Sequence, residues 1–179
     1  QGVAITHEHN DHISALPVLL RNTAWQFLLT APTKKAIELK THVVIPDSRW
    51  VPIQSGSSLE FGPWTIKPFS LPHDAVDPVA FRIESEGRSL AVITDLGHIS
   101  QGVRQSCAGL DTLVIESNYD EQMLVDGGYA PELKARILSK VGHLSNEDTA
   151  GLLSTMDTSH LHRVVLAHLS EENNHADLA

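Results

Sequence analysis

The stretch Thr6-His-Glu-His-Asn-Asp-His12 begins at the last residue of a short segment, residues 3–6, whose composition is typical of a buried strand. Within six positions it places three imidazoles and the carboxylate of Asp11, beside a second carboxylate at Glu8. Because alternate residues of an extended segment point the same way, His7 and His9 can bind one metal ion. Asp11 and His12 fall where the chain turns toward the next predicted helix, and they can face a second ion. A histidine-rich surface loop is the alternative interpretation of this stretch.

Further candidate ligands argue against a mere surface loop, because each comes directly after an apolar segment of strand character. They are His73, Asp95 and His168. A layered sheet brings the ends of its strands, and the side chains that follow them, to one rim. A single histidine in such a position is usually structural, but these strand ends together with the first cluster indicate a metal site.

Composition limits the class of protein. With 179 residues and 41% apolar content the chain can bury one sizeable core, and we expect a single domain over residues 1–179. No apolar run is long enough to cross a membrane, and the start of the chain lacks the pattern of a signal peptide. The single cysteine, Cys107, excludes an internal disulfide framework and fits a reducing cytoplasm. The formal charge of −9 argues against broad electrostatic binding to nucleic acid, although a nuclease whose metals supply local positive charge stays possible.

Local patterns predict an α/β layered domain. Strands are expected at residues 3–6, 26–30, 58–61, 64–71, 79–85, 88–94, 113–116 and 163–167. Helices are expected at residues 13–21, 32–40, 131–141 and 145–156. The last of these begins at a capping box, Ser145 with Asp148. Since the chain begins inside a strand and has no evident stop, we expect a fragment of a longer polypeptide.

The pattern His7-x-His9-x-Asp11-His12, followed by separate His, Asp and His residues, resembles the ligand set of the metallo-β-lactamase superfamily over nearly the whole chain. The resemblance implies a four-layer αβ/βα sandwich with the site at one edge, here without the family's N- and C-terminal segments. It also implies two divalent metal ions, Zn²⁺ or Mn²⁺, between which the ligands alone do not choose. The implied ligands form two groups joined by a bridging Asp95: His7, His9 and His73 in one, and Asp11, His12 and His168 in the other.

Three more segments resemble the YycJ/WalJ branch of this superfamily and, more distantly, ribonuclease Z. They are Val114-Ile-Glu-Ser-Asn-Tyr-Asp120, Gly142-His-Leu-Ser-Asn-Glu-Asp148 and Leu166-Ala-His-Leu-Ser-Glu-Glu-Asn-Asn174. Members of that branch are bacterial cytoplasmic proteins that act as DNA exonucleases. By this resemblance Glu116 and His143 assist phosphodiester cleavage, with His143 either as proton donor to the departing oxygen or as a phosphate contact. The alternative is that His143 only caps the helix that follows it.

The function implied is a metal-dependent phosphodiesterase with DNA as its substrate, a 5′-to-3′ exonuclease in which Asp11 binds metal and orients the attacking water. The acidic charge favours a second candidate, a hydrolase of a small phosphodiester or of a thioester, as in glyoxalase II. A third candidate is a non-catalytic scaffold that keeps the fold. The scaffold would be expected only if ligands had been lost, and all of the candidate ligands are present.

Overall fold

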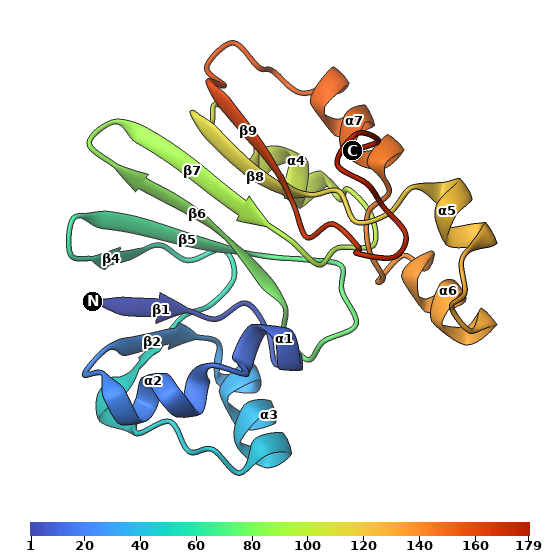
Figure 1. Cartoon of the computed structure of the whole chain (residues 1–179). Helices are drawn as coiled ribbons and strands as arrows, with labels where there is room; N and C mark the ends of the chain where they lie inside the picture. Colours follow the sequence, from blue (N-terminus) through green and yellow to red (C-terminus); the bar gives the residue numbers. More distant parts are fainter.

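Two β-sheets face each other in the computed structural model, which describes residues 1–179. The smaller sheet has three strands in the order β1-β2-β3, and the larger has six in the order β4-β5-β6-β7-β8-β9. Helices α2 and α3 cover the outer face of the smaller sheet, and α4 and α7 lie against the larger one (Figure 1). The layers therefore run helix, sheet, sheet, helix, and the predicted αβ/βα sandwich is confirmed.

The elements have the following bounds. The strands are β1 Gly2–Ala4, β2 Gln26–Leu29, β3 Trp50–Pro52, β4 Leu59–Phe61, β5 Trp64–Ser70, β6 Val79–Ser85, β7 Arg88–Ile93, β8 Thr112–Glu116 and β9 Arg163–Ala167. The helices are α1 Asn10–Ile13, α2 Leu16–Asn22, α3 Ala31–Thr41, α4 Gln101–Ser106, α5 Glu121–Asp126, α6 Pro131–Ile137 and α7 Asn146–Thr155, with a 3-10 turn at Asp47–Arg49. No helix is long and apolar enough to cross a membrane.

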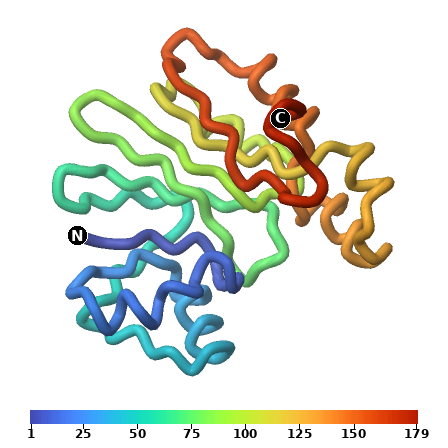
Figure 2. Tube along the Cα trace, in the orientation of Figure 1, coloured from blue at the N-terminus to red at the C-terminus, as the bar shows by residue number.

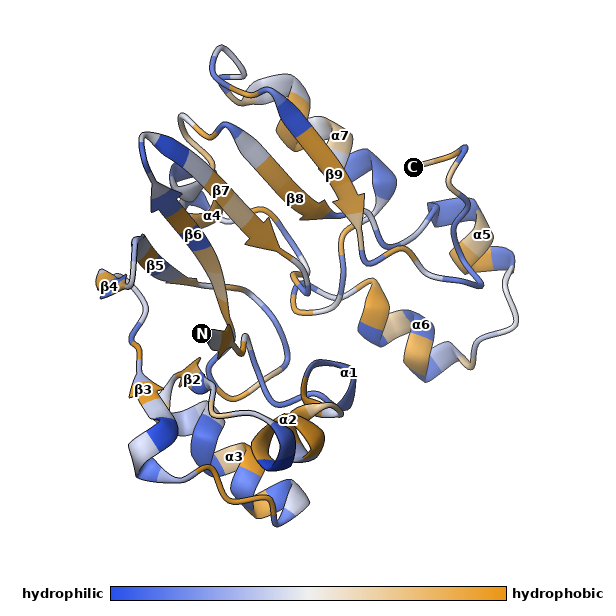
Figure 3. Ribbon diagram, turned by 60° about the vertical axis from the view of Figure 1, so that its left-hand side comes forward, coloured by the Kyte–Doolittle hydropathy of each residue, from blue (hydrophilic) through white to orange (hydrophobic).

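Each space between layers has its own apolar core. The first, between α1–α3 and the smaller sheet, includes Phe27 and Ile37, neither of them exposed to solvent. The second, between the two sheets, includes Leu28 and Phe81. The third and largest packs β5–β8 against α4 and α7. Apolar residues occupy the C-terminal halves of β7, β8 and β9, the ends from which candidate ligands follow (Figure 3).

One hydrogen bond ties the ends of the two sheets together. The amide of Val79, at the start of β6, donates to the carbonyl oxygen of Thr6 at 3.1 Å. The segment between β5 and β6 thereby lies beside the segment that follows β1, as the tube in Figure 2 shows. Residues far apart in sequence meet at this edge, among them His7 and His73.

The predicted bounds of two helices were wrong. The helix predicted at 13–21 is two helices, α1 and α2, because Pro17 has no amide hydrogen to continue α1 and instead occupies the first turn of α2. The helix predicted at 131–141 ends at Ile137, the amide of His143 then donating to the Ile137 carbonyl. Ile137 is buried, whereas Leu138 and Val141, which follow the end of the helix, are 47% and 42% exposed. Helices α4 and α5 and strand β3 were not predicted, since segments of three to six residues show little periodicity.

We expect Leu113→Ala, in β8, to lower the free energy of unfolding by about 2–5 kcal/mol, because this fully buried side chain packs between the larger sheet and its helices. Its register partner in β9, Val164, is 39% exposed, and Val164→Ala is the matched control, with an expected loss of less than about 1 kcal/mol. Urea denaturation followed by circular dichroism measures both. Equal losses in the two variants would contradict the packing described here.

Candidate metal centre

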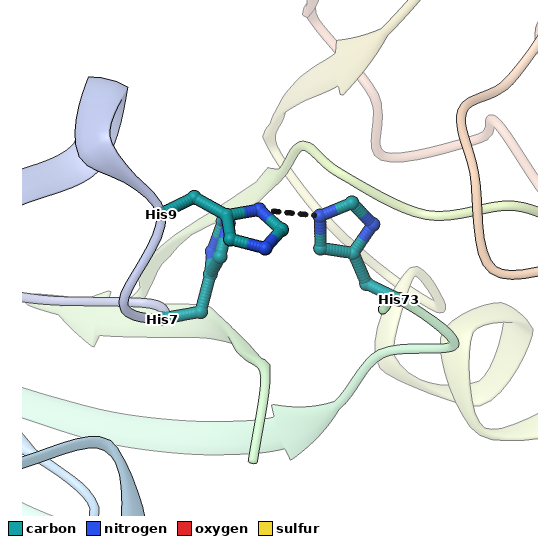
Figure 4. Close-up of side chains that lie close together, drawn as sticks. All are labelled: His7, His9 and His73. Atoms are coloured by element: carbon teal, nitrogen blue, oxygen red, sulfur yellow. Dashed lines mark hydrogen bonds between the residues drawn. The ribbon is translucent and has the colours of Figure 1, made fainter. Parts of the chain in front are cut away.

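Three histidines from separate parts of the chain form the first ligand group. His7 and His9 follow β1, His73 follows β5, and each offers a ring nitrogen within 4.8 Å of the others'. Figure 4 shows the three rings converging, with Nδ1 of His9 3.2 Å from Nε2 of His73. The Nε2 atom of His7 is buried and has no hydrogen-bond partner. A buried, unpartnered imidazole nitrogen beside two facing ones is the donor set that a divalent cation satisfies.

The second group consists of Asp11, His12, Asp95 and His168, again with ligand atoms within 4.8 Å of one another. Nε2 of His12 lies 3.0 Å from Oδ2 of Asp95, and Nε2 of His168 lies 3.7 Å from Oδ1. The Asp11 side chain is 63% exposed at the mouth of the site, 3.4 Å from the His12 ring. Three of the four are thus enclosed by the fold, whereas Asp11 faces solvent.

Asp95 lies between the two groups. Its Oδ1 is 3.7 Å from Nε2 of His168 in the second group and 3.9 Å from Nε2 of His73 in the first. A carboxylate with one ligand group on either side has the placement that a bridging ligand needs. The residues predicted from the sequence as two ligand groups with Asp95 between them are therefore brought together by the fold.

Backbone strain accompanies two of these ligands. Asp95 and His168 have φ values of 65° and 56°, in the left-handed region that residues with a side chain avoid. Asp95 comes two residues after the end of β7, and His168 comes directly after β9. Strained backbone of this kind persists where the surrounding structure holds it, commonly at functional sites. Here it turns each side chain away from its strand and toward the cluster.

The protonation states of several candidate ligands suit the binding of a cation. Burial, aided by the neighbouring His12, lowers the pKa of His7 to about 3, and burial also lowers the pKa of His73, so both are neutral imidazoles near neutral pH. Burial alone would raise the pKa of Asp95, but its hydrogen bond with His12 and the other surrounding histidines outweigh burial and lower it. Asp95 is thus an ionised carboxylate, and His7 and His73 are imidazoles with free lone pairs, the forms that ligate metal. The hydrogen bond with Asp95 outweighs burial and raises the pKa of His12.

Glu116, at the end of β8, is completely buried and organises the histidines of the second half of the chain. Its Oε1 accepts hydrogen bonds from Nδ1 of His143 at 2.7 Å and from Nδ1 of His168 at 2.6 Å. Its Oε2 accepts from the amides of Leu96 and Leu144, at 3.1 and 3.3 Å. Both oxygens accept hydrogen bonds from protein donors, so Glu116 orients the two imidazoles. Its carboxylate also falls in a third cluster of possible ligand atoms, with Asp95, His143 and His168.

These hydrogen bonds determine which nitrogen of each ring is free. With Nδ1 engaged by Glu116, His168 presents Nε2 toward Asp95, and His143 likewise keeps Nε2 available. The hydrogen bond with Glu116 raises the pKa of His168 to about 9, so a cation at Nε2 would replace a proton there. His143 does not cap α7, because Ser145 is the N-cap and its Oγ accepts from the Asp148 amide at 3.0 Å. The N-cap predicted at Ser145 is thus confirmed, the reciprocal bond of a full capping box is not among the hydrogen bonds of the structure, and the interpretation of His143 as the cap of this helix was wrong.

Several supporting residues were not predicted from the sequence. Thr6 Oγ1 lies 2.9 Å from Nδ1 of His7 and 3.2 Å from Nδ1 of His12, which directs Nε2 of both rings inward. The Gly142 carbonyl lies 3.2 Å from Nδ1 of His73 and plays the same part. A Cβ on Gly142 would lie 2.1 Å from the Ile137 carbonyl oxygen, so only glycine fits this turn. Thr6 could have been suspected from its place beside the cluster, but no sequence signal connects residue 142 with residue 73.

A further unpredicted contact joins α6 to the first ligand group. Arg136 donates from Nε and Nη2 to the two carboxylate oxygens of Asp74, at 2.5 and 3.0 Å. Asp74 Oδ1 is itself 3.4 Å from Nε2 of His73. A guanidinium group is therefore fixed at the rim of the site through the residue next to a candidate ligand.

Two bacterial proteins are similar in sequence to this chain over almost its full length. A protein named exodeoxyribonuclease YycJ from Bacillus anthracis is 37% identical over 178 residues, which is 99% of this chain and 67% of the relative. A protein named exodeoxyribonuclease WalJ from Streptococcus pneumoniae is 36% identical over 179 residues, 99% of this chain and 66% of the relative. The chain therefore spans about two thirds of the length of these relatives.

Solved structures share the fold at lower identity. Zn²⁺-bound PqqB from Methylobacterium extorquens superposes with a TM-score of 0.72 at 19% identity, covering 97% of this chain and 61% of PqqB. Human tRNase Z, short form, gives 0.62 at 19% identity, covering 95% of this chain and 72% of that one. The family model described as beta-lactamase superfamily domain matches residues 1–169. The chain belongs to the metallo-β-lactamase superfamily, in the branch that contains YycJ and WalJ.

Proposed function

We propose that this chain carries the catalytic centre of a dinuclear metal-dependent DNA exonuclease that digests from 5′ to 3′. The observation that carries the proposal is the pair of ligand groups on either side of Asp95, with His143 held by Glu116 beside them. The substrate class is supported by the relatives named exodeoxyribonucleases. Superfamily membership and these relatives make the chain a metal-dependent hydrolase, and a bacterial cytoplasmic location stays a prediction.

Each candidate residue has one part in this proposal. His7, His9 and His73 would hold one divalent ion, Zn²⁺ or Mn²⁺, and Asp11, His12 and His168 the other, with Asp95 shared. Such ions supply positive charge to a phosphodiester and acidify water. Asp11, exposed at the mouth, would accept a hydrogen bond from the attacking water and orient it. Glu116 holds His143 in place, and His143 would donate the proton that the departing oxygen needs.

A small-ester hydrolase is the second candidate, and one observation favours it. The formal charge of −9 opposes the approach of a polyanion, whereas a small phosphodiester or a thioester bears little or no charge. Both candidate functions would use the same metal ions. They differ in the substrate that would bind beside His143, a DNA strand or a small ester.

The first prediction concerns metal stoichiometry. We expect the metal-free chain to bind two equivalents of Zn²⁺ or Mn²⁺ by isothermal titration calorimetry, and to show a higher melting temperature when loaded, since ions that bind only the folded state stabilise it. His73→Ala should retain about one equivalent, because it removes a member of one group only. His160→Ala, an exposed histidine outside both groups, is the control and should retain both. A single equivalent bound by the unaltered chain would contradict the dinuclear assignment.

The second prediction concerns the substrate. The metal-loaded chain should progressively shorten a 5′-phosphorylated linear DNA duplex, and Asp95→Ala should lose this activity because both ligand groups contact that carboxylate. Gel electrophoresis of timed samples, beside the absorbance of a chromogenic small phosphodiester, measures both reactions. Cleavage of the small ester alone would move the assignment to the second candidate.

The third prediction concerns the proton donor. His143→Ala should lower kcat on DNA by about 10²–10⁴-fold, as loss of a general acid does. The loss should be much smaller on a nitrophenyl phosphodiester, whose leaving group departs without a proton. Metal content, measured by elemental analysis, should be unchanged, because His143 belongs to neither proposed ligand group. Equal losses on both substrates would show that His143 acts in some way other than as an acid.

A further inference from the structure

A cavity of about 370 Å³ opens beside His143 and His168, on the side of the site away from the smaller sheet. Its walls come from α6, from Asn118 and Tyr129, and from residues 169–172, which follow the last candidate ligand. The volume is at the lower end of the range for small-molecule sites, about 300–1,000 Å³. A space of this size accommodates one nucleotide but not a duplex.

The walls of this cavity combine apolar, positively charged and negatively charged side chains. Tyr129 and Leu133 present an aromatic ring and an apolar side chain, on which a nucleobase can stack or pack. Arg136 is the only lysine or arginine of the lining, and it is half exposed. Glu171 and Glu172, both exposed, line the cavity as well. A phosphate entering the cavity is therefore attracted to Arg136 and repelled by the glutamates.

Arg136 is also held in a defined position. Its Nε and Nη2 are taken by the carboxylate of Asp74, which leaves Nη1 without a protein partner. The same carboxylate lies 3.4 Å from the His73 ring. The guanidinium is thus fixed relative to the ligand histidines by a single intermediate side chain. A group bound at Nη1 would have a set distance from the reacting phosphodiester.

We propose that this cavity receives the 5′-terminal nucleotide of the DNA strand, with the terminal phosphate on Arg136 and the base against Tyr129 and Leu133. The inference rests on the proposed exonuclease function and adds the group by which the enzyme recognises a strand end. The next phosphodiester then lies at the ligand groups. The oxygen of water bonds to its phosphorus, the bond from phosphorus to O3′ breaks, and O3′ of the terminal nucleotide takes a proton from His143. The product is a 5′-mononucleotide in the cavity.

The test compares one DNA duplex with either a 5′-phosphate or a 5′-hydroxyl end. The unaltered chain should prefer the phosphorylated end by about 10–100-fold in kcat/KM, the effect of one charge-assisted arginine–phosphate contact. In Arg136→Ala this preference should fall to about onefold, mainly through KM. Arg136→Lys should retain part of it, since lysine contacts phosphate as a point charge. Arg104→Ala, an exposed arginine on α4, is the control and should keep the full preference.

A second variant tests the cavity itself. Leu133→Trp places a larger side chain on its wall and should lower kcat/KM on DNA about tenfold more than on a chromogenic small phosphodiester. Melting temperature and metal content are measured for every variant, because a merely structural role for Arg136 would change these and leave the end preference intact. An unaltered preference in Arg136→Ala, or no preference in the unaltered chain that degrades DNA, overturns this inference alone. Hydrolysis of the small ester without any degradation of DNA overturns the exonuclease function and this inference with it.

Discussion

The buried carboxylate of Glu116 is the constraint on which the rest of the site depends. An ionised group without solvent contact is costly unless donors surround it, and Glu116 has four: two backbone amides and two imidazoles. These donors come from the segments after β7, before α7 and after β9, so a single side chain ties together three parts of the larger sheet's rim. Removing the carboxylate would leave both imidazoles free to turn, and removing any donor would leave a buried charge undercompensated.

The same principle governs the first ligand group, whose histidines come from both sheets. There the Nδ1 atoms of His7 and His73 are held by the Thr6 hydroxyl and the Gly142 carbonyl. The hydrogen bond from Val79 to Thr6 fixes the two sheets against each other close to these rings. The first group therefore takes His7 and His9 from the end of the smaller sheet and His73 from the end of the larger one, and Asp95 lies beside both ligand groups. A site divided in this way exists only when both sheets are packed.

The negative formal charge of the chain would oppose the binding of DNA, but positive charge at the site makes it compatible with the proposed nuclease function. The chain has a formal charge of −9, but Arg136 is fixed at the rim of the site and cations in the ligand groups would add positive charge within it. Attraction of a polyanion is then confined to the region of the chemistry. The proposed binding of a strand end in a cavity fits this charge distribution, because the net negative charge of the chain opposes contact with phosphates far from the site.

The sequence by itself determined the strands around the site, the layered α/β character and the identities of the candidate ligands. These follow from local rules: alternation of apolar residues, capping at Ser145, and polar residues just past strand ends. The tertiary structure alone decided the Glu116 network, the contact between Arg136 and Asp74, and the early end of α6 at Ile137. Helix α6 ends with a hydrogen bond between residues only six positions apart, His143 and Ile137, whereas the first two depend on contacts between residues 20 to 62 positions apart, such as Arg136 with Asp74 and His168 with Glu116. Local pattern carries no information on such pairs, because burial and packing of the sheets, not neighbouring residues, bring them within hydrogen-bond distance.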